Sequence, residues 1–195
     1  RTPADVRALR TYDVAGKLPF VPETFARIHA ALDGEMPVLG FAGAPLTLAV
    51  FLAEGGSFGQ SAPAAIEFLR AHPRALHELL DKIADLTIDY LALQAQAGAE
   101  AVQLFESAAY LFTPEQYREF ALPYQQRIFG ALKGVVRTIV FARDIDDITL
   151  LRDAGADVLS LPAKADIREV RRHFGLDLVV QGNLSNRLLA QGPLE

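Results

Sequence analysis

The chain of 195 residues contains no cysteine. This absence excludes disulfides, thiolate-bound zinc, iron–sulfur clusters and a cysteine nucleophile within these residues. The chain also lacks any apolar run near the roughly 20 residues that a membrane span requires, so we expect no membrane partner. Its first residues, Arg1-Thr2-Pro3-Ala4-Asp5, lack the apolar stretch of a secretory signal. Together these absences favour a cytoplasmic protein.

An excess of positive charge is missing as well. The sequence has 19 Lys and Arg residues against 24 Asp and Glu residues, which gives a formal net charge of -5. A nucleic-acid partner needs a basic surface, so we expect none. A chain of this length can bury one sizeable core, and we treat residues 1–195 as a single domain.

What is present is an alternation of helices and strands. Pro3 after Thr2, with Asp5 in the first turn, marks the start of a helix. Apolar runs and β-branched residues predict strands at residues 37–42, 101–105, 135–141, 158–161 and 178–180. Apolar spacing and capping residues predict helices at residues 23–32, 46–54, 113–132, 148–154 and 167–174, and over 64–97 with an interruption at His72-Pro73.

The strands are apolar without alternation, which indicates a parallel sheet that is buried on both faces. Five βα units fit either an open doubly wound sheet or part of an eight-stranded barrel, and the pattern alone leaves both open. If the chain is part of a barrel, three of the eight strands are absent from it and the edges of its sheet are exposed. Residues 1–195 would then fold poorly on their own.

Polar side chains follow the predicted strands, at the end where parallel α/β proteins bind their ligands. Ser107 follows the strand at 101–105 and could bind a carboxylate or a ring N–H. Its neighbour Glu106 is equally compatible with a buried ion pair and with a site residue. Arg143 follows the strand at 135–141, and its planar guanidinium suits a carboxylate ligand. An ion pair between Arg143 and the neighbouring Asp residues is an equally good interpretation.

Other candidate motifs give weaker signals. Asp144, Asp146 and Asp147 could hold Mg²⁺, but acidic residues at this position more often cap the next helix. The four His residues fall on predicted helices away from the strand ends, so we expect no metal site. The glycines at residues 40–43 and 55–59 lack the partners of a dinucleotide fingerprint and of a phosphate loop.

Five blocks of the sequence occur in one order along a known enzyme family. Residues 40–48 (GFAGAPLTL) resemble the block G-F-A-G-A-P-W-T-L, and residues 96–107 (QAGAEAVQLFES) resemble Q-A-G-A-D-A-V-Q-[IL]-F-[DE]-S. Residues 121–124 (ALPY) resemble the next helix, residues 141–143 (FAR) resemble F-A-K, and residues 180–184 (VQGNL) resemble Q-G-N-L-D-P. On these blocks, which span essentially the whole chain, the sequence resembles the uroporphyrinogen decarboxylase family.

The resemblance implies an α/β fold, a (β/α)8 TIM barrel, of which this chain carries about five central βα units without the N- and C-terminal parts. It implies a lyase that removes CO2 from the four acetate side chains of uroporphyrinogen III to give coproporphyrinogen III in haem biosynthesis. It also implies a homodimer and no metal or organic cofactor. A protonated pyrrole is the electron sink for the departing CO2, so the protein has to bind a polycarboxylate and supply protons in a dry pocket.

The resemblance assigns substrate-binding positions to this span but no catalytic residue. The family's Arg-rich block and an Asp directed at the pyrrole N–H groups precede the span, and a His follows it. Ser107 aligns with a Ser that contacts the substrate, and Phe41 and Phe105 align with aromatic residues of the pocket. Arg143 is a further substrate-binding candidate at the strand ends.

One candidate position departs from the family. Phe51 stands where the family has Tyr, so a hydroxyl that is expected to bind a substrate carboxylate is missing. Tyr110 stands where the family has Gly after its [HW]-A, and it could supply a hydroxyl from another strand.

Two alternatives remain. A related barrel methyltransferase, which moves methyl groups from a corrinoid protein to a thiol, relies on a His-x-Cys…Cys zinc site, and the absence of Cys from this span counts against it. A homologue that binds tetrapyrroles without turnover would explain why the strand ends are changed more than the framework.

Overall fold

The computed structural model describes residues 2–192. Five parallel strands form one sheet: β1 (Leu39–Gly43), β2 (Ala101–Glu106), β3 (Arg137–Ala142), β4 (Val158–Ser160) and β5 (Val179–Gln181). Their spatial order, β1-β2-β3-β4-β5, is their order along the chain. A doubly wound sheet reverses its strand order at a switch point, whereas a barrel adds each strand on the same side. The barrel prediction is therefore confirmed, and the chain forms a five-stranded arc of it.

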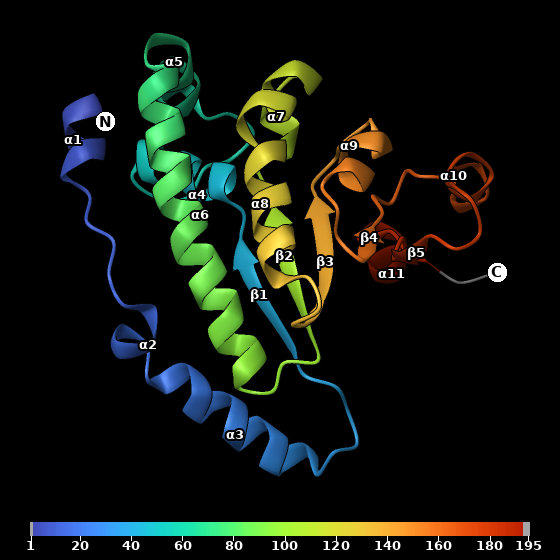
Figure 1. Cartoon of the computed structure of the whole chain (residues 1–195). Coiled ribbons are helices and arrows are strands. Elements are labelled where there is room, and N and C mark those ends of the chain that lie inside the picture. Colours follow the sequence, from blue (N-terminus) through green and yellow to red (C-terminus); the bar gives the residue numbers. More distant parts are fainter. Residues whose placement is uncertain (1, 193–195) are drawn as a thin grey trace.

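Helices precede, connect and follow the strands, and five of the eleven that the structure describes begin at proline, because the first helical position needs no backbone N–H donor. Figure 1 shows α6 and α8 on the near side of the sheet, with β1 visible between them, β3 to the right of α8 and α3 crossing below the sheet. The helices are α1 (Pro3–Ala8), α2 (Val14–Lys17), α3 (Phe20–Leu32), α4 (Pro45–Glu54), α5 (Pro63–Ala71), α6 (Pro73–Gln96), α7 (Pro114–Phe120), α8 (Leu122–Leu132), α9 (Ile148–Asp153), α10 (Ile167–Phe174) and α11 (Asn186–Gln191). A 3-10 turn, η1 (Ala109–Leu111), follows β2.

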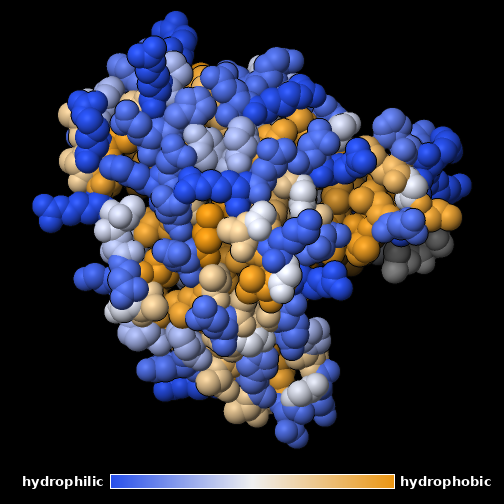
Figure 2. Space-filling model, viewed as in Figure 1, coloured by the Kyte–Doolittle hydropathy of each residue, from blue (hydrophilic) through white to orange (hydrophobic). Residues whose placement is uncertain are grey.

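The two faces of the sheet differ in burial. Side chains that face the helices, such as Val102 and Val140, are fully buried. On the opposite face, which would be the interior of a closed barrel, Phe41 is 63% exposed and Val179 is 55% exposed. Figure 2 shows hydrophilic residues over most of the helical layer and apolar residues at the surface of the C-terminal segment, where Leu188 is exposed. The expectation of burial on both faces therefore holds on the helical side, and on the opposite face only for central residues such as Gln103 and Ile139.

Most predicted elements are present within a few residues, and the break at His72-Pro73 is confirmed by the boundary between α5 and α6. One prediction is wrong, because the helix expected over 113–132 is two helices that meet at Ala121. Pro123 provides the reason, since it cannot donate the backbone hydrogen bond that a continuous helix needs at this position. The short elements α2, η1 and α11 were not predicted. Within residues 2–192 no helix combines the length and the apolar character needed to cross a membrane.

Candidate active site at the strand ends

Three phenylalanines form an aromatic row across the first three strands. The rings of Phe41 and Phe105 meet edge to face with their centroids 6.0 Å apart, and those of Phe105 and Phe141 are 5.5 Å apart. Phe105 and Phe141 are register partners in β2 and β3. Phe41 lies two positions lower in β1, because Gly43 is the partner of Phe105. The row lies on the face without helices, close to the carboxyl ends of the strands, and it makes that face apolar and aromatic.

Ser107 lies next to this row. The two residues that flank it, Glu106 and Ala108, are both hydrogen-bonded to the side chain of Thr47. Thr47, at the start of α4, donates its hydroxyl hydrogen to Glu106 Oε1 at 2.5 Å. The same hydroxyl oxygen accepts the backbone N–H of Ala108 at 3.0 Å. The backbone on both sides of Ser107 is thus tied to α4. Within residues 2–192 the hydroxyl of Ser107 has no hydrogen-bond partner, so it is available to a ligand.

Glu106 belongs to a buried polar network on the helical side of β2. Its side chain is completely buried, and Oε2 accepts a hydrogen bond from Gln125 Nε2 at 3.2 Å. Gln125 in turn is bonded to the hydroxyl of Tyr117 at 2.9 Å. The described residues supply no cation to Glu106, so the ion-pair interpretation is wrong. Burial raises the pKa of its carboxyl from 4.5 to about 7, although hydrogen bonds from Thr47 and Gln125 oppose the rise.

Arg143 lies at the end of β3, alongside Ser107. Its backbone N–H donates to the carbonyl oxygen of Glu106 at 3.1 Å, and one further step of the register pairs it with Ser107. Its guanidinium carbon lies 5.2 Å from the centroid of the Tyr110 ring. Its Nε lies 3.6 Å from Asp144 Oδ2, so the expected rim ion pair is present in a loose form.

Phe51 lies on α4 and packs against Phe58, with 4.9 Å between the ring centroids. It also borders a cavity of about 470 Å³ at the free edge of β1, together with Phe41, Gly43 and Leu48. This cavity is lined mainly by apolar side chains from β1, α4, α6 and the segment around α2. Phe51 therefore borders the same hollow as Phe41 but does not touch the rest of the aromatic row.

The acidic residues after β3 are structural. Asp147 caps α9 by accepting the backbone N–H of Thr149 at 3.0 Å, which confirms the capping interpretation. Asp147 also pairs with Arg118, and Asp146 pairs with Lys164. No group of three or more His, Asp or Glu side chains suited to a metal ion occurs in the part of the chain that the structure describes.

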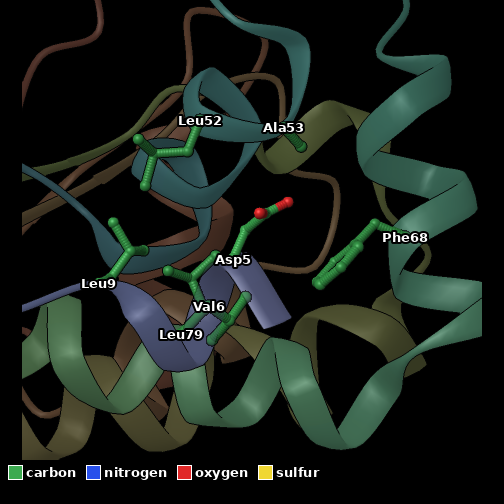
Figure 3. Close-up of a pocket in the computed structure, with 7 residues that line it drawn as sticks. All are labelled: Asp5, Val6, Leu9, Leu52, Ala53, Phe68 and Leu79. Atoms are coloured by element: carbon green, nitrogen blue, oxygen red, sulfur yellow. The ribbon is translucent and has the colours of Figure 1, made fainter. Parts of the chain in front are cut away.

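Figure 3 shows a second hollow, which lies away from the strand ends between α1, α4, α5 and α6. It measures about 150 Å³ and is apolar except for Asp5, whose carboxylate points toward it. That carboxylate accepts the backbone N–H of Thr2 at 2.8 Å and completes the capping box of α1. Its chemistry is therefore that of a helix cap.

The structure brings together four of the five predicted residues, Ser107, Arg143, Phe41 and Phe105, and places Phe51 at the margin. Sequence reasoning missed Phe141 and the role of Thr47. Phe141 could have been found, because the predicted strands that contain Phe105 and Phe141 both end in Phe. In each case the Phe is followed by a small or acidic residue and then by a polar one. Thr47 carried no such signal, since its partners are 59 or more positions away.

A parallel arc wound in one direction defines this chain as part of a (β/α)8-barrel protein, and its aromatic and cationic side chains at the carboxyl ends of the strands are the candidate ligand site. The family model "Uroporphyrinogen decarboxylase (URO-D)" matches residues 1–195. The chain thus belongs to the uroporphyrinogen decarboxylase family.

Individual relatives agree with this assignment. The uroporphyrinogen decarboxylase of Chloroherpeton thalassium is 37% identical over 99% of this chain and 56% of its own length. The corresponding protein of Myxococcus xanthus is 38% identical over 94% of this chain and 53% of its own length. A solved methyltransferase from Methanosarcina mazei superposes with a TM-score of 0.74 over 91% of this chain and 52% of its own chain, at 21% identity, and it supports the fold alone. The chain spans about half the length of the relatives it matches.

Proposed function

We propose that the protein removes CO2 from the acetate side chains of uroporphyrinogen III, giving coproporphyrinogen III, and that this chain supplies the central part of its substrate site. The observation that carries the proposal is the aromatic row Phe41–Phe105–Phe141, which ends beside the open hydroxyl of Ser107 and the guanidinium of Arg143. An apolar aromatic floor with a cationic and polar rim suits a large ring that carries carboxylates on its periphery.

Each described residue has a defined task in this proposal. Phe41 and Phe105 pack against the faces of the pyrrole rings and exclude water. Arg143 binds a peripheral carboxylate, and Ser107 forms a hydrogen bond with another polar group of the substrate. The proton donor is not among these side chains, because Glu106 points into the helical layer. The electron pair of the broken C–CO2 bond passes into the protonated pyrrole, so these residues bind and orient while the substrate accommodates the charge.

The test is direct. The complete protein is incubated anaerobically with uroporphyrinogen III and no added metal, and the oxidised products are separated by their number of carboxylates. A series from eight carboxylates down to four supports the proposal. Unchanged substrate from a folded protein that binds it would favour a tetrapyrrole-binding homologue without turnover. Methyl transfer to a thiol in place of CO2 release would favour the methyltransferase alternative.

The oligomeric state belongs to the same proposal. We propose that the complete protein is a homodimer, as the family resemblance implies. Light scattering at several protein concentrations tests this, and a mass that stays at one chain throughout would contradict it.

A further inference from the structure

Tyr110 joins three segments at the strand ends. It lies in η1, three residues after Ser107. Its ring lies beneath the guanidinium of Arg143, at 5.2 Å from Cζ to the ring centroid. Its hydroxyl donates to the carbonyl oxygen of Gly59 at 2.5 Å. One side chain therefore contacts both the residue that follows β3 and the loop between α4 and α5.

The guanidinium of Arg143 contacts the Tyr110 ring, and much of the side chain is exposed. Its side chain is 53% exposed, and its ion pair with Asp144 runs through Nε at 3.6 Å. Among residues 2–192 no hydrogen bond engages its two terminal nitrogens. The Tyr110 ring occupies one side of the guanidinium, and the terminal N–H groups remain free to bind a carboxylate through two parallel hydrogen bonds.

The neighbouring cations are already paired. Lys164 donates to the carboxylate of Asp146 and, at 3.2 Å, to the backbone carbonyl oxygen of Asp144. Arg118 donates to Asp147 at 2.9 Å. Of the described cations that contact the loop after β3, Arg143 is thus the one whose charge is least neutralised, and the orientation of its guanidinium decides where an anion can bind.

Two departures from the family blocks meet in this contact. Tyr110 stands where those blocks have Gly, and Arg143 stands where they have Lys. A planar guanidinium stacks on an aromatic face, whereas a compact ammonium does so less well. The two departures therefore belong to one contact, between the aromatic ring of Tyr110 and the guanidinium of Arg143.

The hydroxyl of Tyr110 has a separate task. Gly59 belongs to the loop at residues 55–62, which is rich in glycine and therefore costly to order. Phe58 of this loop packs on Phe51 at 4.9 Å between ring centroids. The ring of Phe58 and the hydroxyl of Tyr110 together fasten the loop to α4 and to η1.

We propose that Tyr110 is a positioning residue with two separable functions. Its ring orients Arg143 toward a carboxylate of the ligand, and its hydroxyl fastens the loop at residues 55–62 beside the same site. The inference rests on the proposed function for the class of ligand, a polycarboxylated tetrapyrrole.

Three variants of the complete protein separate these functions. Fluorescence titration with uroporphyrin, the oxidised octacarboxylate, measures Kd at low salt. Tyr110→Leu removes the ring and should raise Kd about two- to fivefold, and Tyr110→Phe should raise it less. Phe174→Leu is the matched control, because it removes a ring at 5.6 Å from the guanidinium of Arg152 on α9 and should leave Kd unchanged. Equal losses from Tyr110→Leu and Tyr110→Phe would overturn the function of the ring.

A double-mutant cycle tests whether the ring acts through Arg143. In an Arg143→Gln background the added Tyr110→Leu change should have no further effect on Kd, because the group that it positions is gone. A second, independent loss of affinity would show that Tyr110 contacts the ligand directly and would overturn the positioning role.

Two readouts without ligand separate failure of this inference from failure of the proposed function. Tyr110→Leu should shift the NMR resonance of the Arg143 Nε–H, since the ring current is lost. Amide hydrogen exchange in the loop at residues 55–62 should be faster in both Tyr110 variants. If the wild-type protein binds no uroporphyrin, the proposed function fails, while an unmoved Arg143 resonance or unchanged exchange in the loop overturns the assignment of Tyr110.

Discussion

The buried carboxyl of Glu106 makes the stability of this fold depend on pH. Burial raises its pKa from 4.5 to about 7, so the folded protein binds a proton more tightly than the unfolded chain does. Stability from this group is therefore fully present below pH 4.5, declines as the pH rises toward 7, and stays low above that pH. A shift of this size corresponds to about 3 kcal/mol of unfolding free energy between the two limits.

Glu106→Gln removes the titration while keeping the shape of the side chain. The amide oxygen can still accept the hydroxyl of Thr47, and Gln125 can rotate its own amide to present oxygen to the new NH2 group. Urea denaturation of the complete protein at pH 5, 6, 7 and 8 gives the unfolding free energies. Relative to the wild type, we expect the variant to gain about 2.5 kcal/mol of stability between pH 5 and pH 8, an upper value because the protein relaxes around a buried charge.

The difference between the two curves isolates Glu106, because every other titrating group is common to both proteins. Glu35→Gln, at an exposed position before β1, controls for the loss of one carboxylate. Wild-type and Glu106→Gln curves that run parallel from pH 5 to pH 8 would refute the reasoning. They would mean that the hydrogen bonds from Thr47 and Gln125 compensate fully for burial.

Four further experiments test the candidate site and the fold that supports it. Ser107→Ala should lower kcat/KM for uroporphyrinogen III by about two- to tenfold, since one hydrogen bond is lost, and unchanged kinetics would remove Ser107 from the site. Phe51→Tyr should lower KM by a similar factor if its hydroxyl reaches a carboxylate, and an unchanged KM would show that the cavity at β1 holds no such group. Gly40→Ala places a Cβ at 2.6 Å from Gln94 Oε1, so we expect a loss of about 1–3 kcal/mol in thermal or urea denaturation, and full stability would contradict the close contact. Residues 1–195 expressed alone should bind a hydrophobic dye and unfold without a sharp transition, because the interior face of the arc is exposed, and a cooperative monomer would contradict this.

The framework of the fold was predictable because local chemistry sets it. Pro45 and Pro73 fix helix starts by their dihedral angle, and Gly55 ends α4 at a positive φ of 79°. Continuous apolar strands identified the parallel sheet. The choice between barrel and doubly wound sheet depends on spatial strand order, which local pattern does not contain, and only the resemblance to a family pointed to it.

The polar part of the site was predictable only in outline. Ser107 and Arg143 could be named because strand ends are where parallel sheets bind ligands. Their supports could not, since Thr47 reaches Glu106 across 59 positions and Tyr110 reaches Gly59 across 51. Tertiary hydrogen bonds of this kind leave no periodic trace in a sequence.

The charges on the two sides of the strand ends fit the anionic ligand that we propose. On the interior side the guanidinium of Arg143 is a positive charge, and on the helical side burial raises the pKa of Glu106 to about 7, which favours its neutral form. An ionised carboxylate directly behind Ser107 would repel the carboxylates of a polyanion in this poorly solvated region. If the proposed site is correct, the packing of β2 against α4 and α6 favours anion binding as well as the fold, because burial raises the pKa of the nearest buried acid.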